Sequence, residues 1–443
     1  RVMSAHFTVY SDLPVAEIEH QTRKLEQLLA AFLKHGWDTH GELPLYVNVV
    51  MLRDHSQFHE LAGDEVAGYA TARVIFEPWL VVPAPTRSEE FQVVSHELTH
   101  YLSRQVMPYQ PRWFSEGLAT YFETAQLDRE EFTLGRIHKS RLASVKAEGL
   151  LGLDILFDDS SDHLNGRYYG SAWLLVHYLM TEHPAAFAKY QVELARGQAH
   201  EQAWSTAFPT VLKPQLEQWL AQYLRRGQFA NFSFPSELVA VPTRSEALRQ
   251  ADEEALWATL WTTARTDRTT AKHKVKEHLA RALLLDPDQE QAVALSLYTV
   301  GRSPEALERA RRLASRHPSS WLAWLTLGYV LWYNGIDDRM HPSPAERALA
   351  LAPRQPFAWM LRAVELMQRG DRAGALSSSK QALRLQPSND EILLLRASLL
   401  AKLGECQQLK NVVRTIRQVR HARLSAREQA ALDKVVGGCV SPP

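Results

Sequence analysis

The sequence predicts an α+β body followed by an all-α region of helical repeats, and three observations support this fold class. Strand-like and helical stretches alternate over residues 1–85, helical patterns dominate over 86–230, and a motif of about 34 residues recurs beyond residue 245. A chain of 443 residues is long enough for two or three domains of ordinary size. We therefore expect a body at 1–230, a linker at 231–244 and a repeat domain at 245–443.

The first 85 residues have the pattern of a sheet-rich lobe. Residues 5–12 and 45–52 are rich in β-branched and aromatic residues, and residues 15–36 between them carry apolar residues at helical spacing. One or two further strands are expected within 71–85, where prolines interrupt and end the run. Residues 72–82 are the candidate edge strand, along which an extended peptide would pair.

The second lobe, residues 86–230, is expected to be helical. Thr86 and Glu89 match a capping box, so a helix should begin between them. Apolar residues then recur at steps of three and four as far as Tyr101, and Pro108 ends the helix.

Within this helix, the stretch VVSHELTHYLSRQ at 93–105 sets two histidines four residues apart. The rings of His96 and His100 should project side by side, within reach of one ion. Zinc accepts neutral imidazole nitrogens at about 2.0–2.1 Å. Glu97 lies one position round the helix, where it can take a proton from a water molecule on that ion. The pattern predicts a zinc site with Glu97 as general base.

A candidate third ligand follows in PRWFSEGLATYFE at 111–123. Pro111 suits the start of a second helix, and Glu116 would lie in its first turns after an antiparallel return. The stretch WFSEGLATYFE resembles the aminopeptidase-type WLNEGFASYFE of the gluzincin metallopeptidases. That resemblance implies a gluzincin-type fold and one zinc ion held by His96, His100 and Glu116. Fifteen residues separate His100 from Glu116, fewer than in these relatives, which we attribute to a shorter loop.

A further stretch, YYGSAWLLVHYL at 168–179, resembles one in small bacterial gluzincin-type proteins, where a tyrosine precedes an apolar helix. The resemblance implies that Tyr169 donates a hydrogen bond to the oxyanion formed during hydrolysis, with Tyr168 as the alternative. Tyr169 as a core aromatic residue is the competing interpretation.

Residues close to these motifs in the sequence are less clearly assigned. Glu123 shares a helix face with Glu116, so it either orients a ligand histidine or is a solvated surface residue. Thr120 stands where thermolysin-type enzymes carry an orienting aspartate. His55 and His59 repeat the four-residue spacing but lack the adjacent glutamate, so no metal site is expected there. His177 lies in an apolar helix and is expected in the core.

Beyond residue 245 the chain repeats itself. Helix-like segments end at Pro287, Pro318, Pro353 and Pro387, at steps of 31, 35 and 34 residues. The stretch WLTLGYVL, which contains Trp324 and Gly328, resembles the tetratricopeptide repeat. The resemblance covers roughly 270–405 and implies a solenoid whose groove binds a peptide segment or a protein partner.

Composition excludes several classes of protein. Apolar residues make up 45% and charged residues 23%, as in soluble globular proteins. The 50 basic and 50 acidic side chains cancel, and no basic stripe suggests nucleic-acid binding. No apolar run is long enough to span a membrane. Cys406 and Cys439 are the two cysteines, and whether they pair is left open.

Together these features lead to the expectation of a zinc-dependent peptidase that acts on peptides or proteins. The amino-terminus-binding G-x-M-E-N box of aminopeptidases is absent before residue 96, which favours internal cleavage. The alternative is a non-catalytic or latent interaction protein, in which the solenoid recruits a partner and the body is structural. The start at Arg1 and the resemblance to exported bacterial proteins favour a periplasmic or extracellular location.

Overall fold

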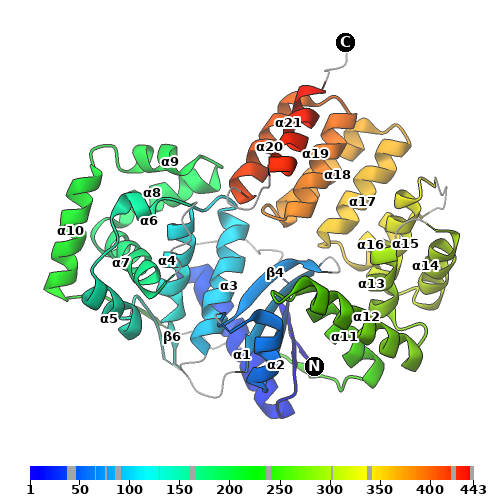
Figure 1. Ribbon diagram of the computed structural model, residues 1–443, viewed down its shortest axis with the longest axis horizontal. Helices are drawn as coiled ribbons and strands as arrows, with labels where there is room; N and C mark the ends of the chain where they lie inside the picture. The colour runs from blue at the N-terminus through cyan, green and yellow to red at the C-terminus, as the bar shows by residue number, and fades with distance from the viewer. Residues whose placement is uncertain are drawn as a thin grey trace.

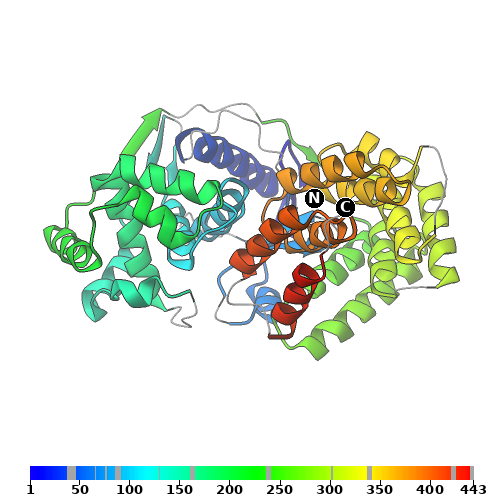
Figure 2. The ribbon, with the colours of Figure 1, turned by 90° about the horizontal axis from the view of Figure 1, so that it is seen from above.

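The computed structural model describes residues 1–36, 46–64, 66–74, 77–84, 91–128, 130–159, 165–235, 241–300, 303–336, 342–420 and 426–439. It is a mixed α/β molecule, mostly helical, with a C-terminal region of repeated helices (Figure 1). Seen from above, the helical lobe lies at one end of the molecule and the middle helices of the repeat region, drawn in yellow, lie at the other, while the last helices of the chain, drawn in red, return towards the centre (Figure 2). Within the described ranges, no helix is long and apolar enough to cross a membrane.

A six-stranded mixed sheet forms the first lobe, in the order β4-β5-β3-β2-β1-β9. Its strands are β1 (Val2–Met3), β2 (Phe7–Ser11), β3 (Val47–Leu52), β4 (Tyr69–Val74), β5 (Glu77–Pro83) and β9 (Arg244–Ser245). Strands β2, β3 and β5 are parallel, and β4 runs antiparallel to β5. The expected edge segment at 72–82 is therefore only partly on the edge, because β5 has a neighbour on both sides and, of the two strands in this segment, only β4 is an outer strand.

Helices cover both faces of this sheet, which explains why β3 is apolar along almost its whole length. Neighbouring side chains of a strand point to opposite faces. Val49 thus belongs to the large core that includes α1 (Val15–Ala31), whereas Val50 packs with α2 (His55–Ala62). A short π-helical turn, η1 (Phe32–Gly36), extends α1.

The helical lobe follows the sheet. Its elements are α3 (Phe91–Val106), α4 (Arg112–Glu123), β6 (Gln126–Leu127), β7 (Glu131–Leu134), α5 (Lys139–Glu148), α6 (Leu153–Leu156), α7 (Gly166–Glu182), α8 (Pro184–Ala195), α9 (His200–Ala207), α10 (Lys213–Arg226) and β8 (Phe232–Pro235). The capping box expected at Thr86 and Glu89 lies outside the described residues. Strands β6, β7 and β8 form a small antiparallel sheet.

The segment expected to be a linker takes part in both sheets. β8 pairs with β7, so that Ser233 lies opposite Thr133. β9 pairs with β1, so that Arg244 lies opposite Met3. The chain is thus anchored to the body at both ends of this segment.

The repeat region is a succession of helices that stack in antiparallel pairs. They are α11 (Gln250–Thr263), α12 (Arg268–Leu285), α13 (Glu290–Val300), α14 (Pro304–Arg316), α15 (Trp321–Tyr333), α16 (Pro344–Leu351), α17 (Pro356–Gln368), α18 (Arg372–Leu385), α19 (Asp390–Lys402), α20 (Cys406–Arg420) and α21 (Ala426–Gly437). Helices α12, α14, α16 and α18 each end two residues before one of the recurring prolines. Proline disfavours the helical conformation of the residue before it, so the prolines mark these ends.

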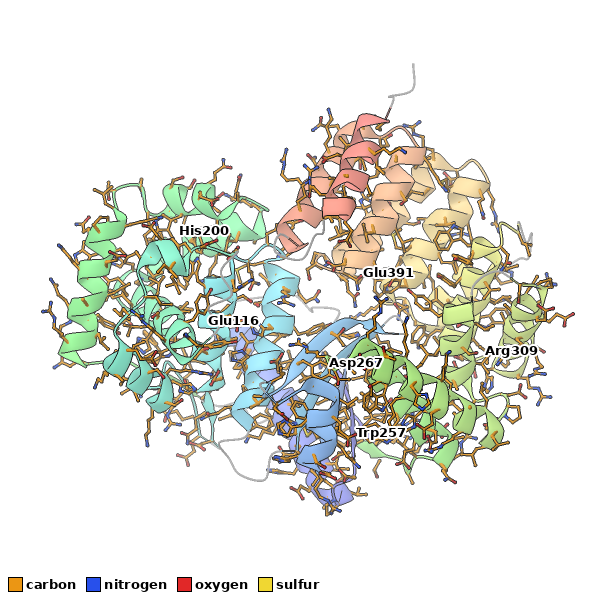
Figure 3. The ribbon with its side chains drawn as sticks, viewed as in Figure 1. Glu116, His200, Trp257, Asp267, Arg309 and Glu391 are labelled. Carbon is orange, nitrogen blue, oxygen red and sulfur yellow. A yellow bond between two sulfur atoms is a disulfide. The ribbon has the colours of Figure 1, made fainter. Side chains whose placement is uncertain are left out.

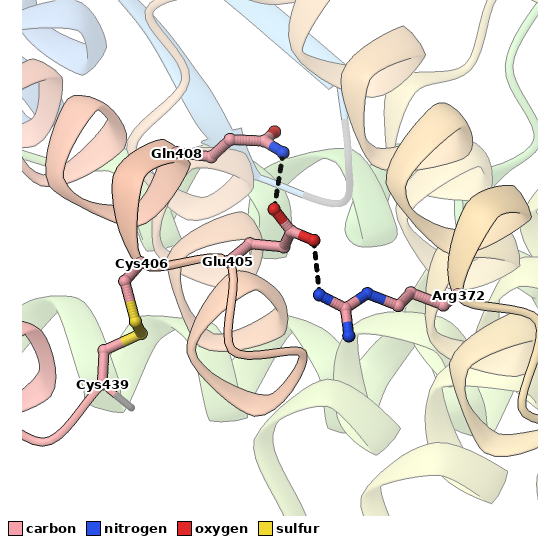
Figure 4. Close-up of a disulfide and its surroundings, with 5 residues drawn as sticks. All are labelled: Arg372, Glu405, Cys406, Gln408 and Cys439. Carbon is pink, nitrogen blue, oxygen red and sulfur yellow. Dashed lines mark hydrogen bonds and ion pairs between the residues drawn. A yellow bond between two sulfur atoms is a disulfide. The ribbon is translucent and has the colours of Figure 1, made fainter. Parts of the chain in front are cut away.

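A disulfide closes the last helix pair. Cys406, the first residue of α20, is bonded to Cys439 just beyond α21, with Cα atoms 5.6 Å apart (Figure 4). The neighbouring Glu405 binds Arg372 and accepts a hydrogen bond of 3.0 Å from Gln408. The pairing left open by the sequence is therefore present.

Among the described residues, the repeat region contacts the body through its first helix and again through α20. Helix α11 packs on the sheet face that carries Val50, where the hydroxyls of Tyr69 and Thr263 are 2.9 Å apart. At the other end, the Tyr109 hydroxyl, in the loop between α3 and α4, donates to the hydroxyl of Thr415 in α20 at 2.8 Å. Figure 1 shows the resulting arc, which begins at the sheet and returns to the upper end of α3.

Candidate metal centre

Two histidines project side by side from α3. The helix buries an apolar stripe that includes Val94, Leu98 and Leu102 in the main core, which leaves His96 and His100 on the flank beside α4. Their Nε2 atoms are 3.1 Å apart, and the two rings lie nearly perpendicular at 83°. Both side chains are largely buried. The four-residue spacing thus brings two imidazole nitrogens to one point.

Helix α4 supplies a carboxylate to the same point. Pro111 takes the N-cap position, and the residues from Trp113 onward are buried except Glu116, which is partly exposed. The Oε2 atom of Glu116 lies 3.5 Å from His96 Nε2 and 3.4 Å from His100 Nε2. In Figure 3 Glu116 is labelled beside α3 within the body. The three residues expected as ligands therefore lie together.

The spacing of these three atoms fits a divalent ion. Four ligands arranged tetrahedrally around zinc at about 2.0–2.1 Å lie about 3.3–3.4 Å from one another. The separations of 3.1, 3.4 and 3.5 Å among the two nitrogens and the oxygen match this edge length. Two imidazoles and one carboxylate are also a donor set found in catalytic zinc sites. Among the described residues, this is the one group of three potential ligands close enough to share an ion.

The outer nitrogens of the two rings are both held by hydrogen bonds. His96 Nδ1 lies 2.6 Å from Glu123 Oε2, and His100 Nδ1 lies 3.0 Å from the Ser115 hydroxyl. These partners fit neutral rings with the proton on Nδ1, which leaves the Nε2 lone pairs directed at the convergence point.

Glu123 is a buried residue of the site rather than a solvated one. Its carboxylate is 9% exposed and accepts hydrogen bonds from His96 on Oε2 and from His138 on Oε1. Burial alone raises the pKa of Glu123, but the hydrogen bonds from His138 and His96 outweigh it and lower the pKa to about 2. Thr120 is buried, and its hydroxyl has no partner among the described residues. Glu123, and not Thr120, therefore contacts the outer nitrogen of His96.

The carboxylates of Glu116 and Glu123 change the pKa of the neighbouring His96 ring. Burial lowers the pKa of His96, yet the hydrogen bonds and charges of Glu116 and Glu123 raise it to about 10. The pKa of Glu116 is well below its usual value, because the attraction of His100 and His96 exceeds the effect of burial. The site favours positive charge at its centre.

Glu97 is placed differently from these carboxylates. It is half-buried, and within the described part of the chain it has no hydrogen-bond partner. Its Cγ lies against Gly68, just before the edge strand β4, where an added Cβ would approach it to 3.2 Å. The Glu97 carboxylate is therefore available for proton transfer beside the edge strand.

The two adjacent tyrosines differ in their surroundings. Burial raises the pKa of Tyr169 to about 12, and Glu116, Glu97 and Glu123 are among the charges that add to this effect. The guanidinium of Arg141 lies 4.7 Å from the centre of the Tyr169 ring. Tyr168 is 1% exposed, and its hydroxyl has no partner among the described residues. Both tyrosines feel the charge of Glu116, and Glu97 and Glu123 act on Tyr169 in addition, so Tyr169 stays the predicted oxyanion donor and Tyr168 the alternative.

The other histidines noted in the sequence lie away from the site. His55 and His59 form no group of potential ligands within the described residues. His177 is fully buried, with its ring nitrogens 2.9 Å from the Tyr223 hydroxyl and from the Gly135 carbonyl oxygen. It is a hydrogen-bonded core residue, as predicted.

Sequence reasoning missed Ser115, Gly68 and His138. Ser115 is adjacent to Glu116 and opposes α3, so helix geometry could have indicated it. Gly68 follows no recognisable motif before β4. His138 lies after a β-hairpin, 42 residues beyond His96, where no local periodicity relates the two positions.

The comparisons with known proteins bear on two parts of the chain. Residues 90–201 match a family model described as a protein of unknown function, DUF1570, and residues 292–339 match the tetratricopeptide repeat. No curated protein matches. Among solved structures, a monomeric mutant of IFIT1 with m7Gppp-AAAA is similar over 80% of this chain at 12% identity, with a TM-score of 0.31. This chain spans 65% of that one. The family match at 292–339 places tetratricopeptide repeats in the C-terminal region.

Proposed function

We propose that the chain is a gluzincin-type, zinc-dependent peptidase. The observation that carries this proposal is the convergence of His96 Nε2, His100 Nε2 and Glu116 Oε2. Glu97 next to them has no hydrogen-bond partner among the described residues. When bound, zinc supplies a Lewis acid that lowers the pKa of water and polarises a carbonyl. A purely structural metal site needs ligands but no base, so the free carboxylate favours catalysis.

The protein's own groups divide the work of hydrolysis. His96, His100 and Glu116 hold the ion, while Glu123 and Ser115 hold the two rings in the required tautomer. The Glu97 carboxylate accepts a proton from the attacking water and passes it to the nitrogen of the departing amine. The Tyr169 hydroxyl donates a hydrogen bond to the oxygen that becomes negative.

We further propose internal cleavage of extended peptide segments. Among the described strands β4 lies at one edge of the sheet, and Gly68 just before it lies against Glu97. A peptide that pairs with this edge passes directly in front of the base. The tetratricopeptide repeats are proposed to bind a protein partner or the substrate, since such repeats commonly act in protein–protein contacts.

The disulfide supports a periplasmic or extracellular location, which we also propose. Disulfides persist in oxidising compartments and are rare in the reducing cytosol. The bond between Cys406 and Cys439 leaves no free cysteine in the chain. Mass spectrometry of protein purified from its natural host under thiol-blocking conditions tests the proposal. Recovery of two blocked thiols would contradict it.

The decisive experiment is the substitution Glu97→Gln. The variant should retain one equivalent of zinc, measured by atomic emission, because Glu97 is not among the ligands. Its rate of cleavage of an unfolded, fluorescently labelled protein should fall by about 10²–10⁴, since the general base is lost. Exposed His59→Gln is the matched control and should leave both quantities unchanged. Retained cleavage by Glu97→Gln, or a wild-type chain without metal, would reject the proposal.

A further inference from the structure

The first turn of α5 reaches the proposed metal centre from outside. His138 is the N-cap residue of α5, and its Nε2 is hydrogen-bonded to Glu123 Oε1. The other oxygen of Glu123, Oε2, lies 2.6 Å from His96 Nδ1. Two side chains, those of His138 and Glu123, thus connect the start of α5 to the proposed metal ligand His96.

The partners of His138 determine where its proton lies. Its Nδ1 faces the backbone N–H of Arg141 at 3.4 Å and the Ser140 hydroxyl at 3.2 Å. The backbone N–H of Arg141 can only donate, so Nδ1 is the acceptor and the ring proton belongs on Nε2, and the Ser140 hydroxyl is able to donate to the same atom. Nε2–H donates to Glu123, and the carboxylate accepts a second hydrogen bond from His96 Nδ1–H. The N-cap of α5 therefore fixes the tautomer of His138 and, through Glu123, that of His96. In this tautomer the Nε2 atom of His96 carries a lone pair and no proton.

Burial makes this arrangement difficult to replace with water. The His138 and Glu123 side chains are 11% and 9% exposed. A buried carboxylate that loses one partner is left partly unsatisfied and rotates or admits solvent. The turn itself is held by packing, because an added Cβ at Gly170 in α7 would lie 2.7 Å from the Arg141 carbonyl oxygen.

We propose that His138 is a positioning residue that fixes the orientation of His96 through Glu123 and thereby strengthens metal binding. The inference rests on the proposed metal centre, and it concerns binding of the ion rather than cleavage of the substrate. Loss of the outer partner of a ligand histidine typically weakens metal binding by about 10–100-fold.

Two substitutions distinguish the positioning of His96 through Glu123 from the capping of α5, since His138 does both. In His138→Asn, the side chain keeps a group near Nδ1 that can cap α5 but has nothing that reaches Glu123. In His138→Gln, the amide nitrogen takes the place of Nε2 and can donate to Glu123, but the cap is lost. Zinc affinity is measured by competition with a chromophoric chelator, and the melting temperature is measured in the presence of excess chelator.

The two variants should change opposite properties. We expect His138→Asn to bind zinc about 10–100-fold more weakly at an unchanged melting temperature. His138→Gln should bind zinc within about threefold of the wild type and melt at a lower temperature. Wild-type affinity in His138→Asn, or a parallel loss of affinity and stability in both variants, overturns the inference. If the variants show these zinc affinities and melting temperatures but the wild type cleaves no peptide, the peptidase proposal is rejected. The role of His138 in metal binding is then still supported.

Discussion

At the scale of single residues, Tyr168 and Tyr169 are adjacent in sequence but have opposite surroundings. The first has a fully buried hydroxyl without a partner among the described residues, whereas the second is partly exposed and has a pKa that burial and the charges of Glu116, Glu97 and Glu123 raise. Only a hydroxyl that reaches the substrate can stabilise a developing negative charge. The pair therefore offers a matched test of the oxyanion donor.

Tyr169→Phe should lower kcat for peptide cleavage by about 10²–10³, since one oxyanion donor is removed, with little effect on KM. Tyr168→Phe should leave kcat nearly unchanged. It should also leave stability unchanged or raise it by about 1 kcal/mol, because it removes an unsatisfied buried hydroxyl. Steady-state kinetics and thermal unfolding of both variants check these outcomes. If Tyr168→Phe is the inactive variant, the two assignments are reversed.

Glu77 gives a residue-scale prediction that is independent of the metal centre. Desolvation raises the pKa of its carboxyl from 4.5 to about 7, against a hydrogen bond of 2.8 Å from Asn48 Nδ2. The folded state thus binds one more proton than the unfolded state between these two values. The associated stability is fully present below pH 4.5 and is lost as the pH rises through about 7.

Over this pH range the free energy of unfolding falls by about 3 kcal/mol. Glu77→Gln should remove this dependence and make the protein more stable than the wild type at pH 8. Denaturant unfolding at pH 5 and pH 8 measures both effects. Equal pH slopes for the variant and the wild type would contradict the raised pKa.

At the scale of secondary-structure elements, the close approach of α4 to α7 fixes the position of α4 and therefore of the proposed ligand Glu116. An added Cβ at Gly117 would lie 2.5 Å from the Ala172 carbonyl oxygen, which is backbone and cannot rotate away. Gly117→Ala should therefore push the helices apart and cost about 1–3 kcal/mol of stability. Because Glu116 is adjacent, zinc affinity should fall as well.

Gly437→Ala is a suitable control for this prediction, since nothing lies within 4 Å of its added Cβ. Unfolding curves and zinc titrations of both variants are the required measurements. A Gly117→Ala protein with wild-type stability would show that the two helices do not constrain each other.

Elements with a local signal were predictable, and pairings between distant segments were not. The helix of His96 and His100 and the helix ends before the recurring prolines follow from spacing and from proline stereochemistry. The interior position of β5 depends on hydrogen bonds with β3 and β4, which no local pattern encodes. His138 likewise reaches Glu123 only through the packing of α5 on α7. Glu123 itself could be assigned to a helix face, but only its burial distinguishes an orienting carboxylate from a solvated one.

At the scale of the whole molecule, the repeat region completes the core of the body. Leu256, Leu260 and Trp261 of α11 pack against the sheet face that carries Trp79 and Val81. Burial of each such side chain stabilises the fold by about 1.5–3 kcal/mol, and a domain has only about 5–15 kcal/mol in total. The body is therefore not independent of the first repeat.

A fragment that ends at residue 240 should melt at a lower temperature than the full chain and bind a hydrophobic dye, because one sheet face is uncovered. A fragment that ends at residue 286 retains α11 and α12 and should regain most of this stability. Thermal unfolding and dye binding of the two fragments and the full chain test the prediction. Equal melting temperatures for the 240-residue fragment and the full chain would argue against a shared core.

The hydrogen bond between Tyr109 and Thr415 has a mechanical consequence. Tyr109 belongs to the short loop from which the helix of His96 and the helix of Glu116 depart in opposite directions. Thr415 belongs to α20, which the disulfide between Cys406 and Cys439 links to the end of α21. A protein partner that displaced α20 would therefore change the angle between α3 and α4, the two helices that carry the proposed metal ligands.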